Sequence, residues 1–202
     1  MKRLVLLIII TLSMVACGDV PDSRIEPPHT IEMDCNGDGK CESMEIKEYV
    51  IGDFNGDGNK EYAALYYYKE LSPDSERYDN GDYYKYSHYN YIIFGDTAIA
   101  TIILEWCASN LVNEGDLDGN GTEDIGYLEF GGYSYWGVYS THSYCLGKWQ
   151  ELVSISHNED WNTAPYQDLV QKSSSKENTL VVMEIQVEEG GIISREVLIN
   201  RQ

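Results

Sequence analysis

Three short segments of the chain carry side-chain oxygen atoms at alternating positions, with glycines between them. The segment DFNGDGNKE, which begins at Asp53, contains three carboxylates within nine residues. Carboxylates this close repel one another by ~4 kcal/mol per close pair at an effective dielectric of ~20. Calcium removes this repulsion because it takes about six to eight oxygen ligands and accepts irregular geometry. The spacing therefore indicates a calcium loop, with an acidic hairpin turn as the plainer alternative.

The pattern places oxygen ligands at loop positions 1, 3, 5 and 9, and a glycine at position 6 permits the sharp bend. The same pattern recurs about sixty residues further along the chain, which indicates two copies of one structural unit. The expected calcium ligands of these two inner loops are Asp53, Asn55, Asp57 and Glu61 in the first, and Asp116, Asp118, Asn120 and Asp124 in the second.

A third loop, DCNGDGKCESME, precedes the other two and begins at Asp34. We expect an EF-hand-like calcium loop here, although strong helices do not flank it. The alternative is a metal-free surface loop closed by a disulfide, because Cys35 and Cys41 bracket the segment and are predicted to pair. The expected ligands are Asp34, Asn36, Asp38, Glu42 and Glu45, the last at position 12, where an EF-hand places a bidentate glutamate.

The elements that must hold these loops are predicted to be strands. Short runs rich in Tyr, Ile, Val and Leu alternate with turns, and no segment has a convincing helical stripe. Each inner loop falls between the first two strands of a four-strand set. The predicted strands are 49–54, 61–69, 88–95 and 98–105 in the first set, and 110–115, 123–130, 135–142 and 148–155 in the second. The predicted fold is all-β, with antiparallel four-stranded meanders of the propeller-blade type followed by a C-terminal meander; a β-sandwich is the alternative.

Three motifs resemble the FG-GAP/VCBS repeats, the calcium-loop blades of integrin-type β-propellers. They are GDFNGDGNKEYAAL from Gly52, GDLDGNGTEDIGYL from Gly115, and IIFGD from Ile92. The resemblance covers residues 48–155 and implies calcium in the hairpin between the first two strands of each blade, held by the eight ligands named above. Propellers of this family usually have about seven blades, so two clear blades cannot close a ring. An arc of blades, a compact sandwich and part of an oligomeric ring stay open as arrangements.

The N-terminus resembles a bacterial lipoprotein signal peptide over residues 1–16. A basic start precedes an apolar run, and the segment Met14-Val15-Ala16-Cys17 resembles a lipobox. The apolar stretch would span roughly 20 Å as a helix, less than the ~30 Å of a bilayer core. The resemblance implies lipidation of Cys17 and a place in the bacterial cell envelope. In enterobacterial lipoproteins, an Asp directly after the lipidated cysteine retains the protein in the inner membrane. Residue 18 is Gly, so the resemblance favours the outer membrane. The alternative is an ordinary signal peptide with a coincidental cysteine.

The remaining chain divides into four predicted segments. Residues 17–33 are expected to form a flexible, lipid-anchored tether, 34–47 the EF-hand-like loop, 48–155 the two blades and 156–202 the C-terminal meander.

Four cysteines, an even number in an exported chain, are disulfide candidates: Cys35, Cys41, Cys107 and Cys145. A simple meander would place Cys107 and Cys145 at opposite ends of the second set. Pairing of these two and a simple meander are therefore hard to reconcile, and the sequence leaves both open.

The charge and the missing catalytic motifs restrict the function. Lys and Arg number 14 against 34 Asp and Glu, and the net charge of -20 repels nucleic acid. The sequence lacks H-E-x-x-H and G-x-S-x-G, so we expect a non-enzymatic, lipid-anchored, calcium-binding module that interacts with another protein. An envelope hydrolase is the least favoured alternative. A carbohydrate-binding module is the other alternative, with the aromatic candidates Tyr84, Tyr86, Tyr135 and Trp136.

The lipobox resemblance makes a testable prediction about anchoring. Cys17→Ser should move the protein from the membrane fraction to the aqueous phase, because lipidation requires the thiol. A single acyl chain gives only marginal binding, so several chains are implied. Detergent partitioning of wild type and variant is the measurement. Equal partitioning of both into the detergent phase would contradict lipidation at this residue.

Overall fold

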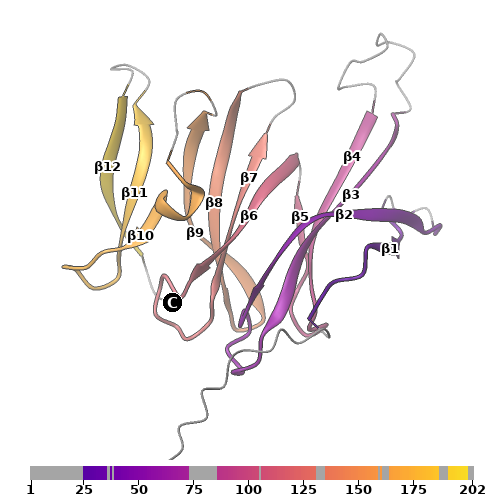
Figure 1. Ribbon diagram of the computed structural model, residues 1–202, viewed down its shortest axis with the longest axis horizontal. Helices are drawn as coiled ribbons and strands as arrows, with labels where there is room; N and C mark the ends of the chain where they lie inside the picture. The colour runs from indigo at the N-terminus through magenta and orange to yellow at the C-terminus, as the bar shows by residue number, and fades with distance from the viewer. Residues whose placement is uncertain are drawn as a thin grey trace, which may run out of the picture.

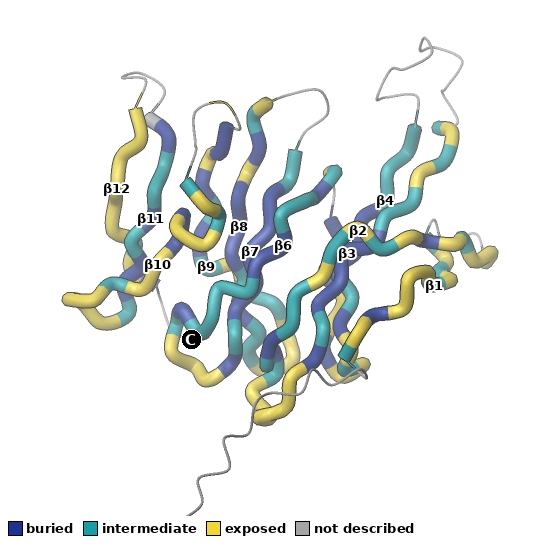
Figure 2. Tube along the Cα trace, in the orientation of Figure 1, coloured by how far each residue is buried: buried dark blue, intermediate teal, exposed yellow. Residues whose placement is uncertain are grey.

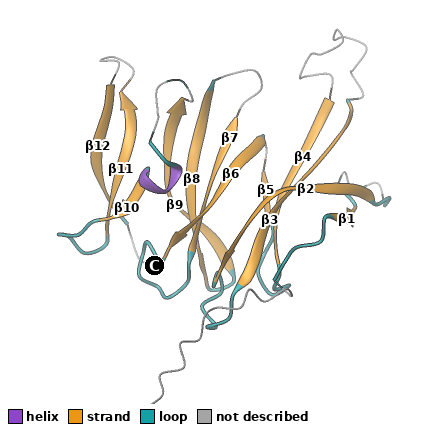
Figure 3. Cartoon of the chain, in the orientation of Figure 1, coloured by secondary structure: helices purple, strands orange, loops and turns teal. Residues whose placement is uncertain are grey.

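The computed structural model describes residues 25–35, 37, 39–72, 86–104, 106–130, 135–158, 160, 164–186 and 191–199. These residues form three antiparallel sheets in chain order and a short 3-10 helix, η3 (Tyr166–Asp168) (Figures 1 and 3). Every strand pairs with its neighbour in sequence, so each sheet is an up-and-down meander. The prediction of an all-β fold made of antiparallel meanders is confirmed.

The first sheet contains five strands, one more than predicted: β1 (Thr30–Met33), β2 (Glu42–Gly52), β3 (Glu61–Leu71), β4 (Tyr86–Phe94) and β5 (Ile102–Leu104). The prediction of a tether as far as residue 33 was wrong, because β1 pairs with the start of β2. Ile31 and Met33 pack against a buried cluster on the outer face of this sheet. The Tyr66 hydroxyl also donates to the Pro28 carbonyl at 2.7 Å, which holds the preceding segment in place.

The second and third sheets follow the same plan. The second contains β6 (Cys107–Gly115), β7 (Asp124–Phe130), β8 (Trp136–Cys145) and β9 (Lys148–Asn158). The third contains β10 (Val170–Lys172), β11 (Thr179–Gln186) and β12 (Gly191–Leu198), and its sequence carries no calcium-loop motif.

The second sheet contributes to a core on each of its faces because its strands alternate apolar side chains between two cores (Figure 2). Tyr127 joins the core shared with the first sheet, which includes Phe54 and Ile92. The adjacent Leu128 joins the core shared with the third sheet, which includes Leu180. The three sheets therefore form an open series, like neighbouring blades of an incomplete propeller (Figure 1).

The meander decides the question of the cysteine pairs. Cys107 lies opposite Phe130, and Phe130 lies opposite Gly137 near the start of β8. Cys145 ends β8, roughly 26 Å further along at ~3.3 Å per residue, whereas a disulfide needs Cα atoms within ~7 Å.

None of the four candidate cysteines, Cys35 and Cys41 included, forms a disulfide in the structure. The Cys35 thiol instead donates to the Met33 carbonyl at 3.5 Å, while Cys41 is exposed. The predicted Cys35–Cys41 bridge is therefore not formed.

The contact between the second and third sheets makes Gly126 sensitive to substitution. A Cβ at Gly126 would lie 2.2 Å from the Tyr139 hydroxyl and 2.5 Å from a Glu114 oxygen. Tyr139 is fully buried and donates to Glu114, so making room for the Cβ would disturb this hydrogen bond. Gly126→Ala should lower the free energy of unfolding by about 1–3 kcal/mol, measured in urea. The control is Gly191→Ala, where a Cβ meets nothing within 4 Å; equal losses in both variants would contradict this account.

Candidate metal centres

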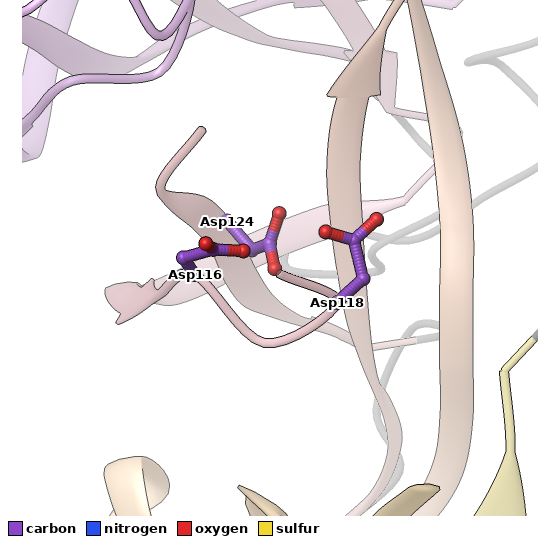
Figure 4. Close-up of side chains that lie close together, drawn as sticks. All are labelled: Asp116, Asp118 and Asp124. Atoms are coloured by element: carbon purple, nitrogen blue, oxygen red, sulfur yellow. The ribbon is translucent and has the colours of Figure 1, made fainter. Parts of the chain in front are cut away.

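The second inner loop, between β6 and β7, brings three carboxylates together. Asp116, Asp118 and Asp124 each offer an oxygen, and these oxygens lie within 4.8 Å of one another (Figure 4). Asp124 is the first residue of β7 and is fully buried, whereas Asp116 sits on the β6 side of the loop. Among the described residues, this is the group of three acidic side chains arranged closely enough for one metal ion.

Asp124 lies in an environment that disfavours the negative charge of its carboxylate. Its Oδ2 accepts a hydrogen bond from the Leu117 amide at 2.7 Å, but its buried Oδ1 has no hydrogen-bond partner among the described residues. Burial raises the pKa of Asp124 to about 7, helped by the charges of Asp118 and Asp116, while Ser143 and the Leu117 amide lower it. Leaving a buried carboxylate oxygen unpartnered costs free energy, and a bound cation would recover it.

Backbone amides fold the second loop around Asp116. Its carboxylate accepts from the amides of Gly119 at 2.6 Å, Asn120 at 3.1 Å and Gly121 at 3.2 Å. Gly121, at position 6, has a φ of 93°, in the left-handed region that glycine enters without steric cost. The Asn120 side-chain oxygen accepts a hydrogen bond from the Thr122 amide at 2.7 Å. The oxygen of this predicted ligand is therefore already bonded within the loop.

The first inner loop, between β2 and β3, has the same hydrogen-bond frame. Asp53 accepts from the Gly58 amide at 2.9 Å, and Glu61 accepts from the Phe54 amide at 2.7 Å. In both loops position 1 therefore accepts from position 6, and position 9 accepts from position 2. Burial raises the pKa of Glu61 to about 7, followed by the charges of Asp53, Asp57 and Asp96.

Asp96 belongs to this first site, although the sequence analysis did not single it out as a ligand. It follows β4, and its Oδ2 accepts from the Asn55 side-chain amide at 2.8 Å. A pocket of about 420 Å³ lies beside the loop and is lined by Asn55, Asp57, Glu61 and Asp96, among others. The signal was present in the motif IIFGD, whose last residue is Asp96.

The third loop, between β1 and β2, repeats the frame again. Asp34 accepts from the Gly39 amide at 3.0 Å, and Glu42 accepts from the Cys35 amide at 3.0 Å. The predicted ligands Asn36 and Asp38 lie outside the described residues.

The prediction of Glu45 as a ligand of the third loop was wrong. β2 begins at Glu42, so Glu45 lies inside the strand, opposite Thr30. Strand alternation turns its side chain to the face opposite that of Glu42. In an EF-hand, the glutamate at position 12 lies at the start of the helix that follows the loop. Here a strand follows the loop instead.

The two inner loops are bonded directly to each other. The Glu123 amide donates to the Asp53 carbonyl at 2.8 Å, and the Asp53 amide donates to Glu123 Oε2 at 3.1 Å. The Asn113 side-chain amide donates both to Glu123 Oε2 at 2.6 Å and to the Ile51 carbonyl at 2.9 Å. Sequence reasoning missed Asn113 and Glu123 because their roles arise only when the two sheets pack together.

The described aromatic candidates, Tyr86, Tyr135 and Trp136, do not line one common pocket. Tyr84, like Cys17, lies outside the described residues. Tyr86 opens β4 and lies under the Lys69 ammonium, 4.9 Å from its ring centre. Tyr135 is 64% exposed, and Trp136 is half-buried and lines a separate cleft on the second sheet.

Comparison with known proteins gives no match to a family model, to a curated protein or to a solved structure. Within the described part of the chain, no helix combines the length and the apolar character needed to cross a bilayer.

The raised pKa of Asp124 predicts a pH dependence in metal-free buffer. The folded state holds this proton up to a pH of about 7, whereas the unfolded chain releases it near 3.8. The free energy of unfolding in EDTA should therefore fall as the pH rises from about 4 to about 7, and change little above that.

Urea unfolding at pH 5 and pH 8 in EDTA measures this dependence. Asp124→Asn should reduce it, and the part that remains includes the contributions of Glu61 and Glu114, whose pKa values are also raised to about 7. A wild type that is equally stable at both pH values would contradict the burial of Asp124 as a strained carboxylate.

Proposed function

We propose that this protein is a calcium-binding β-repeat module, anchored to the bacterial cell envelope through a lipidated Cys17 and acting without catalysis as an interaction module. The observation that carries the calcium proposal is the buried Oδ1 of Asp124, which has no hydrogen-bond partner among the described residues and belongs to a carboxylate close to those of Asp116 and Asp118. The hydrogen-bond frame shared by the three loops and the resemblance of the two inner loops to FG-GAP/VCBS repeats support it.

The donor set favours calcium over other metals. The two inner loops offer only oxygen donors, with neither histidine nor cysteine among positions 1 to 9. Zinc prefers nitrogen and sulfur ligands, and magnesium demands near-ideal octahedral geometry. An irregular loop that presents carboxylates beside amide oxygens suits calcium best.

The position of the loops gives the cation a structural role. The first inner loop joins β2 to β3 and the second joins β6 to β7, and the mutual bonds of Asp53 and Glu123 tie the two loops together. Cations in these loops would fix both hairpins and the contact between the sheets. The result is a rigid surface for a partner, placed near the membrane by the lipid anchor, with the outer membrane as the proposed location.

Calcium should raise the thermal stability of the protein. Extracellular calcium modules bind with Kd values of about 10⁻⁴–10⁻³ M. At ~2 mM calcium and a Kd of ~10⁻⁴ M, each site adds about 1.8 kcal/mol to the free energy of unfolding. Thermal unfolding in EDTA and in millimolar calcium measures this rise, and Asp53→Asn combined with Asp116→Asn should remove most of it.

A matched control separates metal binding from general charge effects. Asp160→Asn with Asp168→Asn makes the same change in net charge at exposed positions outside the loops. This control should keep the full calcium-dependent rise in midpoint. A wild type without any calcium-dependent rise would show that the loops are only acidic turns.

A further inference from the structure

A cleft of about 570 Å³ lies on the second sheet, on the face that looks toward the first sheet. Its lining includes the indole rings of Trp106 and Trp136, the carboxylates of Glu129 and Glu151, and the hydroxyls of Ser154 and Ser156. The volume falls within the range of small-molecule sites, about 300–1,000 Å³. Most of its lining residues come from β7, β8 and β9, away from the calcium loops.

The cleft exists because the two sheets part toward one end. Glu129, Val138 and Ser156 lie side by side on neighbouring strands and share the face of Tyr127. Tyr127 still belongs to the core between the first two sheets, whereas Val138 is 45% exposed. In Figure 1 the first and second sheets diverge toward the end where β7 stops and β8 begins. The described residues therefore leave the face beyond Tyr127 uncovered.

A β-bulge brings Glu151 into this face. The pairing of β8 with β9 shifts between Thr141 and His142, so His142 lies opposite Glu151 while Thr141 lies opposite Val153. Without the shift, alternation from Ser154 would place Leu152 on the cleft side. Leu152 packs instead against the core shared with the third sheet. Bulges commonly re-aim a side chain in this way.

The chemistry of the lining limits the ligand. None of the described residues that line the cleft is lysine or arginine, so phosphates and other anions are disfavoured beside two carboxylates. Trp106 is 45% exposed and presents an apolar ring surface next to polar groups. The carboxylates accept hydrogen bonds, and the serine hydroxyls both donate and accept.

We propose that this cleft binds a neutral saccharide. A sugar ring has an apolar face that packs on an indole and hydroxyl groups around its edge that bond to carboxylates and serines. The polar groups here come from three adjacent strands that lie ~4.8 Å apart, a row that suits several hydroxyls at once. An organic ammonium ion would instead favour aromatic faces gathered around one point. The inference names the partner class of the proposed interaction module and rests on that function only in this respect.

Binding to defined oligosaccharides tests the proposal. The full chain, in a detergent without sugar head groups and about 2 mM calcium, is titrated calorimetrically with maltotriose, cellotriose and triacetylchitotriose, and with choline as the cationic probe. At least one trisaccharide should bind saturably. Trp106→Ala with Trp136→Ala should weaken its binding by about tenfold or more. Tyr135→Ala is the matched control, because this exposed ring neighbours Trp136 in sequence but does not line the cleft.

The outcomes are distinct. Failure of all three trisaccharides to bind, stronger binding of choline than of any of them, or wild-type affinity in the double variant would each overturn the proposal. A cooperative thermal unfolding transition reports whether the double variant folds. If it does not fold, Glu151→Gln, which keeps the shape of an exposed side chain, decides by the same loss of affinity. Loss of the calcium effect in the wild type would overturn the proposed function alone, because saccharide binding is measured separately.

Discussion

The architecture depends on one residue in each acidic loop, the residue at position 2. Its amide is fixed by the carboxylate at position 9, and its side chain enters a buried core. Phe54 does this in the first inner loop and Leu117 in the second, each belonging to a different core between sheets. Cys35 repeats the arrangement in the third loop, against the outer face of the first sheet. The conformation of each loop and the packing of each core are therefore set by the same hydrogen bond.

This arrangement explains why a carboxyl group is retained at the edge of a core. Glu61 and Asp124 are buried because they must reach an amide whose side chain lies in the interior. Burial disfavours the charged form of a carboxylate unless hydrogen bonds or a cation compensate. The loop thus creates the electrostatic strain that the proposed calcium ion would relieve, and it does so at the point where the hairpin enters the sheet.

The strands and the loop frame were predictable because both are local. Alternation of period two gave most strands, and the glycines at position 6 gave the bend. β1 was missed because Pro27 and Pro28 stand just before it and mask a four-residue strand. The bonds between Asp53 and Glu123 were not predictable, because they depend on how two sheets pack.

The same limit applies to the cleft. Trp136 was recognised as an aromatic candidate, but Trp106 and Glu151 join it only through the divergence of the sheets and through a bulge. Cysteine spacing also misled, since nearness in sequence between Cys35 and Cys41 carries no information about the direction of their side chains. A sequence pattern predicts the structure of one element. A site shared between elements can be predicted only when the packing of those elements is known.

The first and third sheets, at the two ends of the series, differ in how their outer surfaces are protected. On the first sheet, Ile31 and Met33 cover the outer face and Pro28 is bonded to Tyr66. On the third sheet, β12 is an edge strand whose Leu198 is 69% exposed. An open edge invites pairing with a foreign strand, and charged side chains discourage it. Ion pairs between β11 and β12 and beside them, Arg195 with Glu184 and Lys176 with Glu196, place such charges there. The two ends of the series therefore differ: packed side chains cover the outer face beside β1, whereas ion pairs flank the edge at β12.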